Sequence, residues 1–151
     1  MARRSSIREA ARHLGFRSGL EATVARFLEA QEVPAEYEKN KLKYEVPARV
    51  ATYTPDWLLP NGIVIETKGL FNTADRQKHL LIKNQHPDLE LRFVFSRVKT
   101  RISKISKTTY GDWAKHHGFQ FAEEKPPIAW LNEPPNPHRM AAARAAFGIK
   151  S

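Results

Sequence analysis

Two carboxylates and a lysine lie at the open end of a predicted β-hairpin. Asp56 comes just before the apolar residues 57–59, and Glu66 and Lys68 follow the apolar residues 63–65. Apolar runs on either side of a short turn predict two antiparallel strands. Opposed residues of a hairpin share a face, and side chains alternate between the faces along each strand. Whether the charged groups meet therefore depends on the length of the turn.

The residues between the two runs favour a three-residue turn. Pro60 suits the first position of a type I turn, and Gly62 suits the left-handed residue that closes a three-residue loop. A two-residue turn would instead send Glu66 to the face opposite Asp56. With the longer turn, we expect Asp56, Glu66 and Lys68 to converge on one face.

This group of side chains has the chemistry to hold a divalent cation and a phosphate together. Hard cations such as Mg²⁺ take carboxylate oxygens together with phosphate oxygens and water. A lysine can orient the attacking water and neutralise charge that develops on a phosphate. In the structural alternative, Glu66 and Lys68 are solvated strand residues and Asp56 belongs to a Pro-Asp turn. The strand reads as buried on both faces, and unpaired buried ions are costly, so the pattern favours a functional site.

Composition points to an anionic partner. The 151 residues include 25 Lys and Arg against 16 Asp and Glu, which gives a net charge of +9. Such an excess is typical of proteins that bind nucleic acid. The chain has no cysteine, which excludes a disulfide scaffold, cysteine zinc sites and a thiol nucleophile, and fits a reducing cytoplasm. No apolar run approaches the length of a membrane span.

A third carboxylate begins the strongest predicted helix of the first half. Ser18 and Glu21 have the spacing of a capping box, and apolar residues follow at helical intervals before Pro34. Glu21 can reach back to the Ser18 amide as a capping residue. It can equally be presented to a site from the first helical turn. The residues themselves leave both interpretations open.

Basic residues are concentrated in two further segments. Residues 1–16 form a basic arm that either orders on DNA phosphates or merely solubilises the chain, and residues 97–107 have no acidic side chain. A loop whose charged residues are all basic favours phosphate contacts. A predicted helix over residues 73–86 adds further basic side chains. The residues expected to contact DNA are Arg3, Arg4, Arg8, Arg12, Arg17, Arg76, Lys78, Lys99, Arg101 and Lys104.

The remaining pattern predicts an α/β domain over residues 17–132, with a mixed central sheet flanked by helices. Residues 37–53 read as a long extended arm, which is a type of segment that pairs with another chain. Residues 90–96 read as a strand parallel to the preceding one, because a helix crosses between them. Residues 133–151 are rich in Pro and also contain Arg, and we expect this tail to be disordered.

The motif and its surroundings resemble a known family. Pro55-Asp56, nine intervening residues and Glu66-Thr67-Lys68 match the PD-(D/E)xK nuclease motif. The wider pattern resembles the endonuclease I family of T-odd bacteriophages, which are Holliday-junction resolvases. The resemblance covers residues 16–130. The matching segments are FRSGLE at 16–21, YTPD at 53–56, LPNGI at 59–63, ETKGL at 66–70 and KHLLI at 78–82.

The resemblance implies a restriction-endonuclease-like core, a strand-swapped homodimer and a metal-dependent nuclease of the host bacterial cytoplasm that cuts four-way and branched DNA. Asp56, Glu66 and the Thr67 carbonyl would bind Mg²⁺ or Mn²⁺, Glu21 would assist a second ion, and Lys68 would position the attacking water. The products would carry a 5′-phosphate and a 3′-hydroxyl. The protomers would interlock through residues 37–54.

Two alternatives remain open from the sequence. The chain can be a PD-(D/E)xK nuclease that acts on duplex or mismatched DNA, since the motif does not encode junction shape. It can also be a non-catalytic basic DNA-binding protein whose carboxylates are structural.

Overall fold

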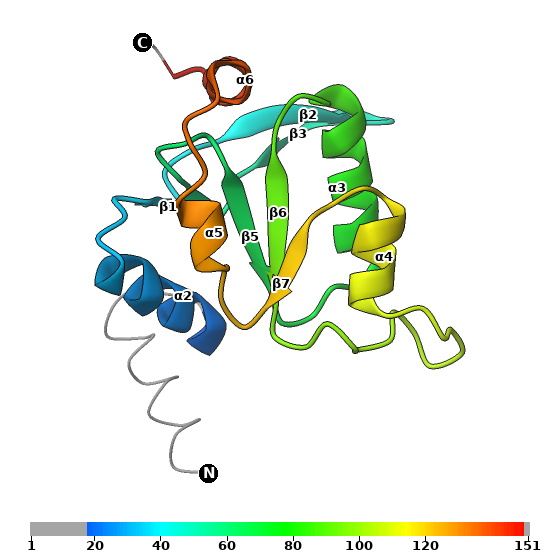
Figure 1. Ribbon diagram of the computed structural model, residues 1–151. Helices are drawn as coiled ribbons and strands as arrows, with labels where there is room; N and C mark the ends of the chain where they lie inside the picture. The colour runs from blue at the N-terminus through cyan, green and yellow to red at the C-terminus, as the bar shows by residue number, and fades with distance from the viewer. Residues whose placement is uncertain (1–17, 150–151) are drawn as a thin grey trace.

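A five-stranded mixed β-sheet organises residues 18–149, which are the residues that the computed structural model describes. Its strand order is β1-β4-β5-β6-β7, with antiparallel pairing from β1 to β5 and parallel pairing from β5 to β7 (Figure 1). The expected mixed α/β sheet is confirmed. The strands are β1 (Glu36–Tyr37), β4 (Trp57–Leu58), β5 (Val64–Lys68), β6 (Leu91–Phe95) and β7 (Phe121–Glu123).

Helices cover both faces of this sheet (Figure 1). The helices α3 and α4 pack on one face over a core that is rich in aromatic rings, and α2 and α5 pack on the other. Among the described residues, no helix is long and apolar enough to cross a membrane. The helices are α2 (Gly19–Ala30), α3 (Thr73–Gln85), α4 (Tyr110–His116), α5 (Ile128–Leu131) and α6 (Pro137–Phe147).

The turn between β4 and β5 has three residues, as predicted. Trp57 pairs with Ile65, and Leu58 pairs with Val64. The Leu59 amide donates to the Ile63 carbonyl at 2.9 Å, which extends the same register toward the turn. Away from the turn, the same register places Asp56 opposite Glu66, and the Asp56 amide lies 3.3 Å from a Glu66 carboxylate oxygen. Gly62 closes the turn with φ of +92°, a backbone conformation that other residues adopt rarely.

The strand β5 is buried on both faces, which agrees with its continuous apolar sequence. Val64 belongs to the core under α3 and α4, whereas Ile65 belongs to the core under α2 and α5. The strand β6 lies parallel to β5, with Glu66 paired with Phe93, and α3 forms the crossover. The predicted parallel pairing is confirmed. Glu66 and Lys68 therefore lie at the carboxyl end of a buried strand, a common position for ligand sites in α/β sheets.

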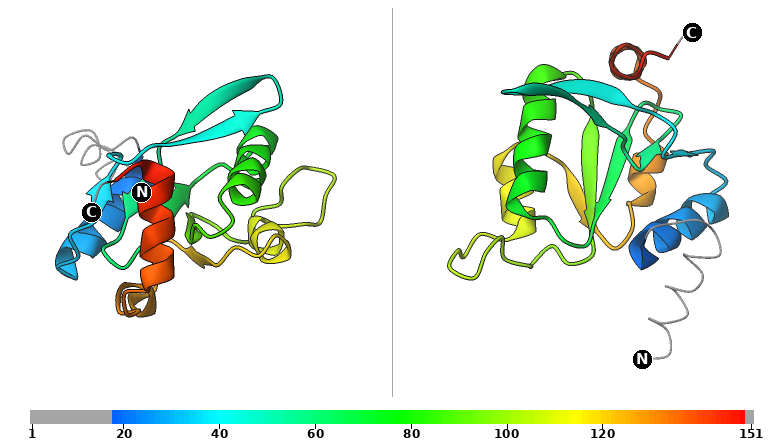
Figure 2. Two further views of the ribbon diagram at one scale, coloured as in Figure 1. Left: turned by 90° about the horizontal axis from the view of Figure 1, so that it is seen from above. Right: turned by 180° about the vertical axis from the view of Figure 1, so that it is seen from behind.

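The segment predicted as one extended arm folds back on itself. The strands β2 (Leu42–Val46) and β3 (Arg49–Tyr53) form an antiparallel hairpin in which Val46 pairs with Arg49. This hairpin is a separate two-stranded sheet that projects beside α3 (Figure 2). The expectation of a single long strand was wrong for this chain alone. The turn was not predicted, because Pro47 and Ala48 are not residues that the usual two-residue hairpin turns favour.

The C-terminal segment also differs from its prediction, because residues 137–147 form helix α6 in place of a disordered tail. The β4–β5 turn anchors the chain that leads to this helix: the Asn61 side-chain amide donates to the carbonyls of Trp130 (2.9 Å) and Glu133 (3.2 Å). Side-chain atoms of Arg139 and Met140 of α6 lie 3.1 Å from the position that a Cβ on Gly62 would occupy. A larger residue at position 62 would therefore require the helix or these side chains to shift.

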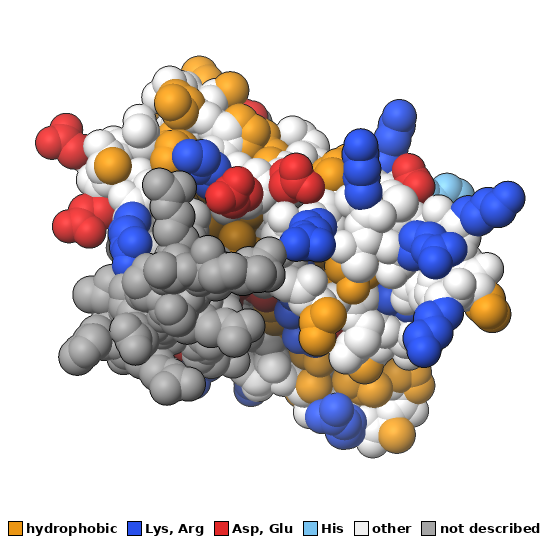
Figure 3. All heavy atoms as spheres, turned by 90° about the horizontal axis from the view of Figure 1, so that it is seen from below, with side chains coloured by type: hydrophobic (Ala, Val, Ile, Leu, Met, Phe, Trp, Pro, Cys, Tyr) orange, Lys and Arg blue, Asp and Glu red, His pale blue; other side chains and the backbone are white. Residues whose placement is uncertain are grey.

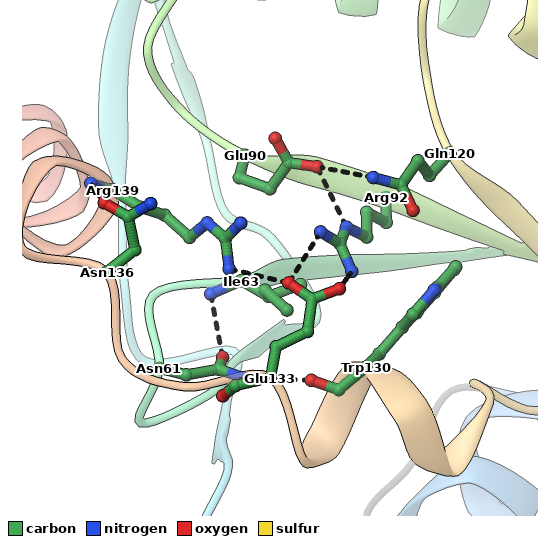
Figure 4. Close-up of polar contacts among 9 residues, drawn as sticks. All are labelled: Asn61, Ile63, Glu90, Arg92, Gln120, Trp130, Glu133, Asn136 and Arg139. Atoms are coloured by element: carbon green, nitrogen blue, oxygen red, sulfur yellow. Dashed lines mark hydrogen bonds and ion pairs between the residues drawn. The ribbon is translucent and has the colours of Figure 1, made fainter.

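A buried arginine completes the attachment (Figure 4). The Arg92 side chain is only 2 % exposed and donates to both carboxylate oxygens of Glu133, at 2.7 and 3.1 Å. It also pairs with Glu90 at 2.9 Å, and its guanidinium carbon lies 5.2 Å from the centre of the Trp130 ring. Arg139 of α6 binds the same Glu133 carboxylate at 2.9 Å. Glu133 thus links strand β6 to α6.

We expect Glu133→Ala to destabilise the protein by about 1–3 kcal/mol, because it leaves the buried Arg92 guanidinium with part of its hydrogen-bonding capacity unfilled. Thermal denaturation measures this loss. The matched control is Glu29→Ala, since Glu29 is an exposed residue of α2. Equal melting temperatures for the two variants would show that the bidentate contact does not stabilise the fold.

Candidate active site

Three carboxylates and a lysine lie around the end of β5. Glu66 and Lys68 belong to β5, Asp56 directly precedes β4, and Glu21 lies in the first turn of α2. The exposed fractions of Glu21, Asp56 and Glu66 are 7 %, 2 % and 4 %. Carboxyl groups that are ordinarily ionised at neutral pH are therefore buried together at one edge of the sheet. Such an arrangement requires hydrogen bonds or a counter-charge.

The Glu66 carboxylate is held by two donors on one oxygen. The Tyr53 hydroxyl donates to Oε1 at 2.8 Å, and the Asp56 backbone amide approaches the same oxygen at 3.3 Å. The other oxygen, Oε2, lies 3.7 Å from the Lys68 ammonium. Lys68 in turn lies 3.8 Å from Asp75, which is in the first turn of α3. Lys68 is thereby fixed between one carboxylate from β5 and another from α3.

Asp56 directs its carboxylate toward Thr67 and not toward Lys68. Its Oδ2 accepts from the Thr67 amide at 2.9 Å and from the Thr67 hydroxyl at 2.6 Å. The expectation that all three charged groups share one face holds for Glu66 and Lys68 but not for this carboxylate. Asp56 lies outside β4, so the strict alternation of a strand does not fix where its side chain points.

Glu21 lies in the first turn of α2, and its carboxylate also belongs to the site. Its backbone amide donates to the Ser18 hydroxyl at 3.1 Å, which is the half of the capping box that Ser18 supplies, whereas between these two described residues the expected contact of the Glu21 carboxylate with the Ser18 amide does not form. Its carboxylate is bound by the hydroxyl groups of Ser18, at 3.3 Å, and of Tyr37. Tyr37 comes from β1, next to the start of β4. The Glu21 carboxylate is therefore held toward Asp56.

A fourth carboxylate, Glu38, joins this region and was missed by the sequence analysis. Oxygens of Glu21, Glu38 and Asp56 lie within 4.8 Å of one another, and we call these three residues the carboxylate cluster. Glu38 has φ of +47°, and its amide donates to the Asp56 carbonyl at 3.0 Å. The sequence assigned this residue to an extended arm. No local pattern indicated the left-handed backbone that brings it to the site.

Burial and like charge shift the protonation of this site. The pKa of Glu66 is raised to about 8, first by burial and then by the negative charge of Asp56, while Lys68 opposes the shift. The pKa of Lys78 is lowered from its usual value by burial and by the neighbouring Lys68. The Lys78 ammonium lies 5.4 Å from the centre of the Tyr53 ring, so this residue, predicted to contact DNA, lies beside the site. Perturbed groups of opposite sign are typical of functional sites.

The other predicted DNA contacts are divided between three places. Arg76 is buried and donates to the Phe71 carbonyl and the Thr73 hydroxyl, so it ties the start of α3 to the preceding loop, and its contact with DNA stays a prediction. Lys99, Arg101 and Lys104 are exposed on the basic loop (residues 97–107). Figure 3 shows Lys and Arg side chains over the end of the molecule where β5 and β6 end. Arg3, Arg4, Arg8, Arg12 and Arg17 lie outside the described residues.

Glu66→Gln should stabilise the metal-free protein increasingly as the pH rises. The pKa of Glu66 is about 8 in the folded state and ordinarily 4.5, so between these two pH values Glu66 is protonated in the folded protein but not in the unfolded protein. Stability contributed by that proton is lost as the pH rises through about 8. We expect the melting temperature of Glu66→Gln, relative to the unmodified protein in chelator, to increase by several degrees between pH 5.5 and pH 8.5, since about 2–4 °C corresponds to 1 kcal/mol at this size.

The exposed Glu29→Gln variant provides the control, because no comparable burial acts on its carboxyl group. A difference in melting temperature that does not change with pH for Glu66→Gln would contradict the raised pKa.

Known proteins are similar to this chain in sequence. Residues 1–146 match the protein-family model for phage endonuclease I. The chain is 51% identical over 119 residues to endonuclease I of Escherichia phage T7, and this match covers 79% of the chain and 80% of the relative. It is 49% identical over 119 residues to endodeoxyribonuclease 1 of Enterobacteria phage T3, with 79% of the chain and 78% of the relative covered. The family resemblance is confirmed: the chain belongs to the phage endonuclease I family and is an endonuclease.

Proposed function

We propose that this protein is a metal-dependent endodeoxyribonuclease that resolves four-way and branched DNA junctions, leaving a 5′-phosphate and a 3′-hydroxyl. The observation that carries the proposal is a series of contacts around the carboxyl end of β5: the Asp56 carboxylate accepts from Thr67, Glu66 lies 3.7 Å from the Lys68 ammonium, and oxygens of Asp56 and Glu21 lie within 4.8 Å of each other. The two relatives are named as endonucleases, one of them as an endodeoxyribonuclease, and the chain's net charge of +9 suits a DNA substrate.

The donor groups fit a hard divalent cation. The carboxylate cluster offers oxygen atoms within 4.8 Å of one another, and the pKa of Glu66 is raised first by burial and then by the negative charge of Asp56. Asp56, Glu66 and the Thr67 carbonyl are the proposed ligands of Mg²⁺ or Mn²⁺, with Glu21 and Glu38 toward a second ion. Such ions polarise phosphate oxygens and lower the pKa of bound water.

Neighbouring polar groups hold Asp56 and Lys68 in place. Thr67 holds the Asp56 carboxylate through two hydrogen bonds, and Asp75 together with Glu66 holds the Lys68 ammonium. Lys68 is 16 % exposed, so its ammonium can reach a phosphate oxygen or a water molecule at the surface. It would position the attacking water and offset charge that builds on the phosphate. The basic loop would contact the DNA backbone beyond the cleaved bond.

The β2–β3 hairpin supports the proposed strand-swapped homodimer. Two-residue hairpins favour turns with positive φ. The described non-glycine residues with positive φ are Glu32, Glu38 and Glu124, so Pro47 and Ala48 do not supply that turn. If the turn at Pro47 and Ala48 opened, β2 and β3 would become one continuous strand. The residues before the turn, with Glu21, would then complete the site of a partner molecule.

The function is tested by cleavage of a four-way junction and of a matched linear duplex, with Mg²⁺ and with chelator. We expect cleavage of the junction only, and only with the metal. Asp56→Asn and Glu66→Gln should each reduce this cleavage at least about 100-fold while junction binding survives, because they remove a carboxylate without removing basic surface. Asp88→Asn changes an exposed carboxylate and should leave cleavage unaltered.

Equal cleavage of both DNAs would favour a nuclease of duplex or mismatched DNA. Junction binding without cleavage in any metal would favour a non-catalytic DNA-binding protein.

The strand swap is tested with a mixed dimer of one Glu21→Ala chain and one Asp56→Ala chain. With a swap, both changes fall in the same site, and the second site keeps Glu21 and Asp56. We therefore expect the mixed dimer to nick a supercoiled cruciform in one strand without resolving it. Both homodimers of the single variants should be inactive.

Complete inactivity of a mixed dimer that is shown to form would contradict the swap, since each site would then carry one change.

A further inference from the structure

The phenol of Tyr53 is the one described side chain that hydrogen-bonds to the Glu66 carboxylate. Tyr53 is 2 % exposed and ends β3, three residues before Asp56. A phenol has an ordinary pKa of about 10, so at neutral pH its hydroxyl is a donor. Since a charged acceptor strengthens a hydrogen bond, the 2.8 Å contact favours one orientation of the carboxylate.

The Tyr53 ring is fixed on its other sides. It meets the buried His79 ring edge to face, with 5.2 Å between the ring centres, and the Lys78 ammonium lies over its face. The ring also belongs to the aromatic core under α3, with Phe71 and Phe93. A side chain packed in this way keeps its hydroxyl in place without support from solvent.

We propose that Tyr53 is a positioning residue. Its hydrogen bond keeps Oε1 of Glu66 bound within the protein, so that Oε2 is directed toward Lys68 and toward the cation. The observations behind this assignment are the two donors on Oε1 and the 3.7 Å separation of Oε2 from the Lys68 ammonium. The assignment rests on the proposed function, because it requires that Glu66 binds a metal ion. Partners that orient a ligand in this way typically raise metal affinity 10–100-fold.

The test is Mn²⁺ binding without DNA, measured by calorimetry on the full chain at neutral pH. Tyr53→Phe should bind Mn²⁺ about 10–100-fold more weakly, and junction cleavage should recover as Mn²⁺ is raised. p-Fluorophenylalanine at position 53 fills the space of the hydroxyl without a proton to donate, and it should show the same loss even if Tyr53→Phe folds poorly. p-Aminophenylalanine restores a donor, so binding should return to within about threefold.

Tyr110→Phe is the matched control, because the buried Tyr110 hydroxyl accepts from the Phe71 amide at 3.2 Å, away from the carboxylates. It should lower the melting temperature without changing Mn²⁺ affinity. Normal Mn²⁺ binding in both non-donating Tyr53 variants would overturn the positioning role.

Asp56→Asn and Glu66→Gln separate this outcome from failure of the proposed function. If these variants also bind Mn²⁺ normally, the metal site itself is wrong, and the role of Tyr53 falls with it. If they lose Mn²⁺ while the Tyr53 variants keep it, only the inference about Tyr53 fails.

Discussion

The register of the β4–β5 hairpin is the constraint on which the rest of the structure depends. The three-residue turn that Gly62 closes sets this register and places Asp56 beside Glu66 at the far end of the strands. A shift by one residue would turn every following side chain to the other face. The same turn anchors the C-terminal segment through Asn61 and leaves room for α6 beside Gly62. One short loop therefore determines both the geometry of the site and the attachment of the last helix.

The site that this register creates carries an electrostatic cost. Glu66 and Asp56 are buried side by side, and their repulsion together with burial raises the pKa of Glu66. Hydrogen bonds from Tyr53, Thr67 and Tyr37 hold the carboxylates in place but supply no positive charge. Lys68 supplies one charge, which it shares with Asp75. A divalent cation is the kind of ligand that binds between neighbouring carboxylates, so the proposed chemistry suits this part of the fold.

The sequence predicted those features that follow from local patterns. The hairpin register, the parallel pairing of β5 with β6 and the Ser18 cap all depend on short-range spacing and turn chemistry. Glu38, Asp75 and Tyr53 escaped prediction as neighbours of the site, because tertiary folding brings them there from three other segments. Arg76 was assigned to DNA by charge alone, although burial gives it partners within the protein. The helix α6 was not predicted because its sequence has only a weak amphipathic pattern. Contacts with the distant β4–β5 turn stabilise it instead.

The central claim is that the carboxylates at the end of β5 form a metal site. Anomalous diffraction from crystals soaked in Mn²⁺ tests it most directly, since it locates the ion without depending on cleavage or on DNA. We predict anomalous density in contact with the carboxylates of Asp56 and Glu66, and its loss in Asp56→Asn. Mn²⁺ bound elsewhere on the molecule, with none beside Asp56, would contradict the account.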